Sequence, residues 1–140
     1  MQNLFISEND EFKIQICVVN GKNGEIYCDT TKDALVKSVL EFMDISKYEF
    51  KDYEIVFRKP SFSDMTILYD QIFSMSVGNS ISFNPLWARY KKFVLLIRQW
   101  NLTTDGSFKK PTEEEIKNLN PLIANIIGRE LDQETGPLLS

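Results

Sequence analysis

Carboxylates are the side chains in this sequence with the most direct potential for chemistry, because the 140-residue chain contains no histidine. Without histidine, neither a Ser-His-Asp or Cys-His catalytic group nor a histidine-ligated zinc or iron site can form. Carboxylate chemistry stays open, as in glycoside hydrolysis or magnesium-dependent phosphoryl transfer. It would require several of Asp64, Asp70 and Asp105 to converge in one pocket. A carboxylate/divalent-metal-dependent enzyme is therefore an alternative hypothesis.

Two further acidic segments have structural explanations. Adjacent helical side chains point about 100° apart, so Glu113 to Glu115 cannot converge on one ion. Acidic residues in a first helical turn instead interact favourably with the helix dipole. The Asp105-Gly106 segment lacks the alternating oxygen ligands and terminal glutamate of a calcium loop, so it predicts a plain turn. We expect no catalytic residue, no metal and no cofactor, and hence no enzyme.

The two cysteines, Cys17 and Cys28, have a predicted register that argues against a disulfide. A three-residue hairpin loop at 22–24, with Gly24 in the left-handed conformation, would pair Val18 with Cys28. Cys17 then points to the opposite face of the sheet, because successive strand residues alternate. We therefore predict two reduced, apolar side chains, and no metal site, since no histidine exists to complete one.

Length and charge limit the classes of protein and partner. The length and the 43% apolar content fit one domain, or two small lobes that share a core. The net charge of −4 does not favour nucleic acid or an acidic membrane as a partner. It divides into −3 over residues 1–59, +3 over 60–111 and −4 over 112–140. A basic middle between acidic ends suits an acidic protein partner or self-association into a homo-oligomer.

The ends and apolar runs of the sequence indicate no membrane segment. The longest apolar run, Phe93 to Ile97, is far shorter than the roughly 20 residues of a membrane-spanning helix. Acidic residues begin at Glu8, with no basic segment followed by an apolar one, so we expect no secretory signal. These observations predict a soluble, intracellular protein with no membrane partner.

Apolar periodicity predicts an α+β fold. Alternating residues indicate strands at 12–19, 25–28 and 53–57, the first two forming a β-hairpin. Stripes with three- and four-residue spacing, together with capping residues, indicate five helices. The first is 31–43, capped by Thr30 and Asp33, and the second follows Pro60, is capped by Ser61 or Ser63, reaches Met75 and is ended by Gly78 and Asn79. The third is 85–100, started by Asn84-Pro85. The fourth is 112–119, with a Thr112/Glu115 capping box, and the last runs from Asn120-Pro121 to Gly136-Pro137.

The elements group into a small α+β lobe at 1–59, a helical lobe of three to four helices at 60–134, and a flexible tail at 135–140. The first lobe contains the hairpin, a packed helix and the third strand. We expect the two lobes to form one cooperative domain.

Three aromatic residues and two lysines are the predicted protein-binding residues. Trp87 lies off the apolar stripe of its helix, so it could anchor an interface. Trp100 and Phe108 are the other two aromatic candidates, and Lys91 and Lys92 would add electrostatic contacts. Both lysines could equally belong to a solvated helix face. A stacking surface for single-stranded nucleic acid is a further alternative, which the helical, core-like spacing of the aromatic residues disfavours.

The segment from Trp100 to Ala124 contains a tryptophan at the end of a predicted helix, an Asp-Gly loop, Pro-Thr-Glu-Glu, a Leu-Asn-Pro step and a final apolar helix. This layout resembles that of small tailed-bacteriophage tail proteins, especially tail assembly chaperones. Upstream, Phe57 to Asp64 is similar to the basic-Pro-polar start of the first helix in the same proteins. The resemblance covers about residues 57–133, and the N-terminal hairpin lies outside it.

This resemblance implies a non-enzymatic viral structural or assembly protein. Its expected partners are other phage tail or baseplate proteins. Its expected location is the host cytoplasm during assembly, and the virion tail if it is retained as a tail, baseplate or connector component.

Overall fold

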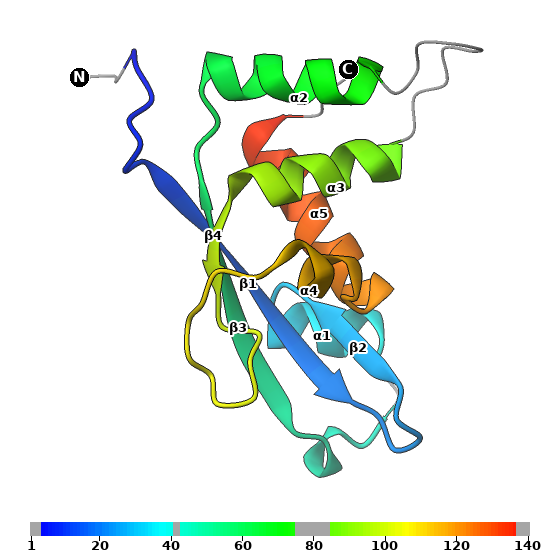
Figure 1. Cartoon of the computed structure of the whole chain (residues 1–140). Coiled ribbons are helices and arrows are strands. Elements are labelled where there is room, and N and C mark those ends of the chain that lie inside the picture. The colour runs from blue at the N-terminus through cyan, green and yellow to red at the C-terminus, as the bar shows by residue number, and fades with distance from the viewer. Residues whose placement is uncertain (1–3, 41–42, 75–84, 137–140) are drawn as a thin grey trace.

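The computed structural model describes residues 4–40, 43–74 and 85–136, and it is α+β (Figure 1). Four strands form one antiparallel sheet in the order β2-β1-β3-β4. The elements are β1 (Glu11–Asn20), β2 (Ile26–Asp29), α1 (Lys32–Ser38), the 3-10 helix η1 (Ile45–Lys47), β3 (Phe50–Arg58), α2 (Phe62–Ser74), α3 (Pro85–Leu96), β4 (Ile97–Trp100), α4 (Glu113–Lys117) and α5 (Pro121–Thr135). No helix in these ranges has the length and apolar character to cross a membrane.

The N-terminal hairpin has the predicted register. Val18 pairs with Cys28, and Gly24 has a positive φ of 84°. Cys17 and Cys28 are free thiols that pack in different hydrophobic clusters, one on each face of the sheet. Desolvation by burial is the main cause that raises the pKa of Cys17 to about 11 and of Cys28 to about 12. Both thiols therefore remain protonated and unreactive at neutral pH.

The main hydrophobic core lies between one face of the sheet and α3, α4 and α5. Alternate residues of β1, such as Ile14 and Ile16, point to this face together with Ile55 and Phe57 of β3. The helices contribute apolar residues including Phe93, Leu96, Ile116, Ile123, Ile126, Ile127 and Leu131. Residues from both predicted lobes thus share one core.

The opposite face of the sheet is partly covered by α1. Leu35 of α1 packs with Cys17 and Val19 in a second cluster. The predicted start of this helix needs correction, because Thr31 rather than Thr30 is the cap, its side chain accepting a hydrogen bond from Ala34 N. The helix also ends at Ser38 instead of continuing to residue 43.

A strand replaces the end of the third predicted helix, so the prediction of helix over 85–100 is wrong for its last four residues. Helix α3 ends at Leu96, and Ile97–Trp100 form β4, which pairs with the edge of β3. Hydrogen bonds from Asn101 N to Glu54 O (3.2 Å) and from Glu54 N to Asn101 Oδ1 (2.7 Å) fix its end. Tertiary pairing has overridden local helix propensity here.

Several helix boundaries are confirmed. Ser61 rather than Ser63 caps α2, because Asp64 N donates to Ser61 Oγ. Asn120 caps α5, and this helix ends before Gly136, which has a positive φ of 81°. Some predicted boundary residues lie outside the described residues: Met75, Gly78, Asn79 and Asn84. The predicted tail at 135–140 is described only at its start, where Thr135 is helical.

A capping box fixes the start of α4. Thr112 Oγ1 accepts from Glu115 N, and Glu115 Oε1 accepts from Thr112 N, both at 3.1 Å. We expect Thr112→Ala to lower the free energy of unfolding by about 1 kcal/mol, because alanine lacks the hydroxyl that accepts the hydrogen bond from Glu115 N. Urea titration would measure the loss. Thr104→Ala, in the exposed loop before α4, is the matched control and should change stability by less than about 0.5 kcal/mol. Equal losses in the two variants would contradict the capping role.

Candidate functional site

The three candidate carboxylates do not converge in this structure. Asp64 and Asp105 line separate pockets, and Asp70 lines neither. Asp64 is bonded to Arg58 and Ser61, whereas Asp105 accepts hydrogen bonds from Thr103 and Ser107. Within the described ranges, no group of three or more His, Cys, Asp or Glu residues could hold a metal ion. The geometric requirement of the enzyme hypothesis is therefore not met among these residues.

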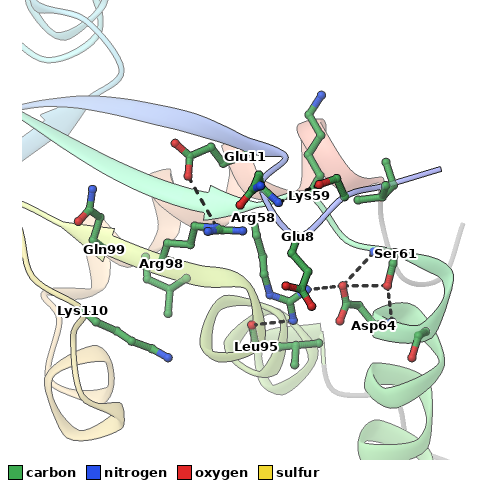
Figure 2. Close-up of a pocket in the computed structure, with 15 residues that line it drawn as sticks. Glu8, Glu11, Arg58, Lys59, Ser61, Asp64, Leu95, Arg98, Gln99 and Lys110 are labelled. Atoms are coloured by element: carbon green, nitrogen blue, oxygen red, sulfur yellow. Dashed lines mark hydrogen bonds and ion pairs between the residues drawn. The ribbon is translucent and has the colours of Figure 1, made fainter. Parts of the chain in front are cut away.

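A polar pocket of about 850 Å³ lies beside the N-terminal segment, the end of β3 and β4 (Figure 2). Its two arginines are paired with carboxylates. Arg58 binds Asp64 and also donates to the carbonyl of Leu95 at 3.3 Å, and Arg98 Nε lies 3.7 Å from Glu11 Oε2. These contacts tie β3 to α2 and β4 to β1. We therefore interpret this pocket as a structural junction, where ion pairs and hydrogen bonds join neighbouring elements, before any binding role.

Asp64 gives this junction a predictable pH dependence. The hydrogen bond from Arg58 is the largest cause that holds the pKa of Asp64 below its ordinary value, and bonds from Ser61 act in the same direction against the opposing effect of burial. Because the folded-state pKa is lowered, the ionised carboxylate stabilises the fold above the unfolded-state pKa of about 3.9. That stabilisation is lost as pH falls toward the folded-state pKa.

We expect Asp64→Asn to lower the free energy of unfolding by about 2 kcal/mol at pH 7, because it removes charge-assisted hydrogen bonds. The gap between variant and wild type should shrink when pH falls below about 4. Denaturant titrations at pH 7 and pH 3 would measure both gaps. Asp70→Asn, at an exposed position of the same helix, should stay within about 0.5 kcal/mol of wild type at pH 7. A gap for Asp64→Asn that is unchanged at pH 3 would refute this account.

An apolar groove between α3, α4 and the start of α5 is the stronger candidate site. Its volume is about 210 Å³, and aliphatic and aromatic side chains dominate its surface. We call it the α3–α5 groove. Its lining residues are Leu86, Arg89, Tyr90, Phe93, Ile116, Leu119, Pro121, Ala124 and Asn125.

The helix starts described above shape this groove. The capping box positions Ile116 of α4, and the Asn120 cap with Pro121 sets the direction of α5. Tyr90 comes from α3, opposite these two helices. The walls formed by α4 and α5 thus lie close to the capped starts of these two helices.

Trp87 and Lys91 lie beside the groove on α3. The Trp87 ring is tilted against that of Tyr90, with centroids 5.5 Å apart, and Lys91 Nζ lies 4.8 Å from the Trp87 centroid. Such a cation–π contact keeps the flat ring in one orientation. Trp87 therefore contacts a residue of the groove directly, and Lys91 contacts Trp87; both side chains are partly buried.

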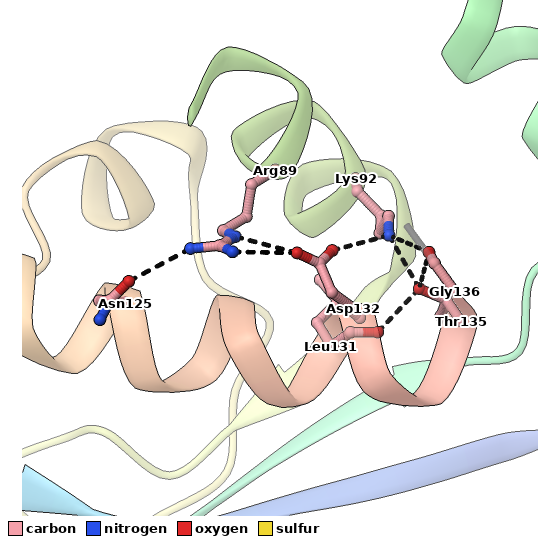
Figure 3. Close-up of polar contacts among 7 residues, drawn as sticks. All are labelled: Arg89, Lys92, Asn125, Leu131, Asp132, Thr135 and Gly136. Atoms are coloured by element: carbon pink, nitrogen blue, oxygen red, sulfur yellow. Dashed lines mark hydrogen bonds and ion pairs between the residues drawn. The ribbon is translucent and has the colours of Figure 1, made fainter. Parts of the chain in front are cut away.

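Lys92 needs a correction, because its side chain is not on a binding surface. It is fully buried, and its ammonium donates to Asp132 Oδ1 (2.8 Å), Thr135 Oγ1 (2.9 Å) and Gly136 O (2.8 Å) (Figure 3). All three ammonium protons thus have acceptors at the carboxyl end of α5. Lys92 fixes α3 to α5, so neither the binding nor the solvated interpretation of this residue holds.

Trp100 needs the same correction. It is 2% exposed and packs edge-on against Phe93 with centroids 6.3 Å apart, so it belongs to the core. Phe108 is 44% exposed, but it lies in the loop before α4 and does not line the groove. The structure therefore brings Trp87 and Lys91 together and separates them from the other three predicted residues.

Comparison with known protein families, curated proteins and solved structures finds no match to this chain.

Two contacts of the groove-lining residue Arg89 were not predicted from the sequence. Arg89 donates to Asp132 at 3.0 Å and to Asn125 at 3.2 Å (Figure 3). Its side chain also passes close to α5 at Gly128. A Cβ at Gly128 would collide with the Arg89 side chain, so a glycine is needed for this close approach. An isolated glycine inside a strong helix pattern was the available signal.

Proposed function

We propose that this chain is a non-enzymatic assembly or structural protein that binds other proteins through the α3–α5 groove. The observation that carries the proposal is an apolar groove with aromatic residues in and beside it. Aromatic side chains at the edge of a desolvated pocket are typical of the residues that contribute most to binding. Trp87, with Lys91 against its ring, is the proposed anchor.

The rim of the groove supports the same proposal. Leu86 is 73% exposed, and Leu122, next to Pro121, is 54% exposed. Exposed aliphatic residues around an apolar depression favour a protein ligand over a small polar one. Phe108 provides a separate exposed aromatic residue, and we retain it as a secondary contact.

We further propose the tail or baseplate of a bacteriophage as the setting. The resemblance to tail assembly chaperones and related tail proteins covers residues 57–133, which include every residue that lines the groove. The partners would be other tail or baseplate proteins, met in the host cytoplasm during assembly. A retained component would also be present in the virion tail.

Co-purification from the native source, followed by mass spectrometry of purified particles, tests this function. We expect the chain to co-purify with tail or baseplate proteins, and a fixed copy number in particles would identify a retained component. Trp87→Ala should weaken the complex at least tenfold, whereas Phe62→Ser, at an exposed position on α2, should not. Recovery of only the free monomer, under conditions that preserve assemblies, would refute the proposal.

A further inference from the structure

Three consecutive apolar side chains near the N-terminus are exposed. Leu4 and Phe5 are each 86% exposed, and Ile6 is 44% exposed. We call Leu4 to Ile6 the apolar arm. Isolated exposed apolar residues are ordinary on a protein surface, but a consecutive run is typical of an interaction site.

A hydrogen-bonded turn holds the base of this arm on the sheet. Ser7 N donates to Asp10 Oδ2 at 2.8 Å, Asp10 N donates to Ser7 O at 3.0 Å, and Lys59 N donates to Asp10 O at 2.9 Å. Figure 1 shows the arm continuing beyond the end of the sheet, on the side away from α4 and the start of α5. In this conformation the arm does not cover the groove of its own chain.

We propose that the apolar arm of one copy of the chain binds in the α3–α5 groove of a second copy, with Phe5 inserted. This inference rests on the proposed function of the groove as a protein-binding site. The groove volume of about 210 Å³ exceeds that of an apolar cavity of about 150 Å³ that holds a benzene molecule. Leu4 and Ile6 would then contact the exposed rim leucines, Leu86 and Leu122.

The charges of the arm and of α3 also favour the apolar arm as the segment that binds in the groove. The arm is followed by Glu8 and Asp10, and the charged residues of α3 are all basic. Arg89 and Lys92 are already paired with Asp132, so Lys91 is the α3 charge that faces outward. Helix α4 carries three glutamates, Glu113 to Glu115, in its first turn and one lysine, Lys117, at its end, so the complementary charge lies on α3 alone. An acidic segment entering along α3 would thus meet complementary charge.

The geometry of such an association is head-to-tail. Donor and acceptor are different surfaces of one chain, so each copy can bind one neighbour through its arm and another through its groove. Contacts of this kind form closed rings or open filaments rather than two-fold symmetric dimers. Three arm side chains make a small interface, so the single contact should be weak and concentration-dependent.

Sedimentation velocity of the full chain over a concentration series up to about 1 mM tests this inference. We expect reversible self-association that Phe5→Ser and Leu86→Glu each weaken at least tenfold. Leu86→Glu places a negative charge against the acidic arm. Phe62→Ser removes an equally exposed phenylalanine from α2 and should leave association unchanged. A wild-type chain that remains monomeric throughout, or association that Phe5→Ser does not change, would overturn the inference.

A crosslink identifies which chain supplies the arm. A mixture of Leu4→Cys and Leu86→Cys chains, which keeps the Phe5 ring, should on mild oxidation give a mixed disulfide between the two variants that neither variant can form alone. Cys17 is buried and Cys28 is partly buried, and the raised pKa of each thiol makes it react slowly. A monomeric intrachain disulfide in the dilute double variant, without dimer in the mixture, would show that the arm folds onto its own groove and would overturn the proposal.

The two proposals fail differently. If the chain stays monomeric in solution but Trp87→Ala disrupts a complex with tail or baseplate proteins, only the arm-in-groove inference is wrong. If copies associate through the arm but no tail or baseplate protein co-purifies, the arm-in-groove inference holds. In that case the proposed assembly role with tail or baseplate proteins is wrong.

Discussion

Trp100→Ala is expected to lower the free energy of unfolding by about 4 kcal/mol, among the largest losses for a single substitution in this chain. The ring is 2% exposed and lies where the last strand, β3 and α3 meet, in edge contact with Phe93. Removing it deletes a large apolar group and leaves a cavity that this closely packed junction can only partly close. Urea titration monitored by far-ultraviolet circular dichroism would measure the loss.

Two matched variants separate burial from aromatic character. Phe108→Ala removes an aromatic ring from an exposed loop position eight residues further along and should change stability by less than about 0.5 kcal/mol. Trp100→Phe should cost only about 1–2 kcal/mol, since it also removes an indole N–H that has no acceptor among the described residues. Similar losses for Trp100→Ala and Phe108→Ala would show that Trp100 is not a core residue.

The error at 97–100 has a specific physical cause. Between β3 and β4 the register shifts, so that Arg98 is an extra residue in the strand and Ile97 and Trp100 face the same side. A three-residue spacing of apolar side chains is normal for a helix, whereas a regular strand requires two. The β-bulge therefore gives a strand the apparent period of a helix, and the pattern alone cannot distinguish them.

Features set by short-range chemistry were predictable. The hairpin register followed from Gly24, and the starts of α4 and α5 followed from the Thr112 capping box and from Asn120-Pro121. Each depends on hydrogen bonds or backbone angles within a few residues, which the sequence states directly. The α+β class followed from the same local patterns.

The candidate site was only half predictable, because its shape depends on contacts between distant segments. Trp87 could be singled out because it lies off the stripe of its own helix. The other wall of the groove, Ile116 and Leu119, comes from α4 and the residues after it. Their approach to α3 depends on how α5 crosses it at Gly128; the glycine indicates a close approach, but the sequence does not say which segment approaches it.

Lys92 shows how residue type can mislead where spacing does not. It lies four residues from both Ala88 and Leu96, which are buried, so helical periodicity places it on the interior face of α3. Its charge argued for solvent because an unpaired buried ammonium is very costly. Three acceptors at the end of α5 remove that objection, and they lie 40 to 44 residues away in the sequence.

Asp132→Ala should therefore lower the free energy of unfolding by about 3 kcal/mol. It leaves the Lys92 ammonium fully buried with only two neutral acceptors, and an uncompensated buried charge is strongly destabilising. Arg89 loses its carboxylate as well, but it is partly exposed and can be hydrated. Denaturant titration at pH 7 would measure the loss.

Substitution of Lys92, the other member of the ion pair, should have a much smaller effect. The comparison tests whether the buried ammonium causes the loss of stability. Lys92→Met keeps similar volume and leaves Asp132 partly exposed and still bonded to Arg89, so we expect a change within about 1 kcal/mol. Combining Lys92→Met with Asp132→Ala should recover much of the stability that Asp132→Ala alone loses, because no buried charge remains. If the double variant were instead as unstable as the sum of both changes, the loss would come from packing at the end of α5 and not from the ammonium of Lys92.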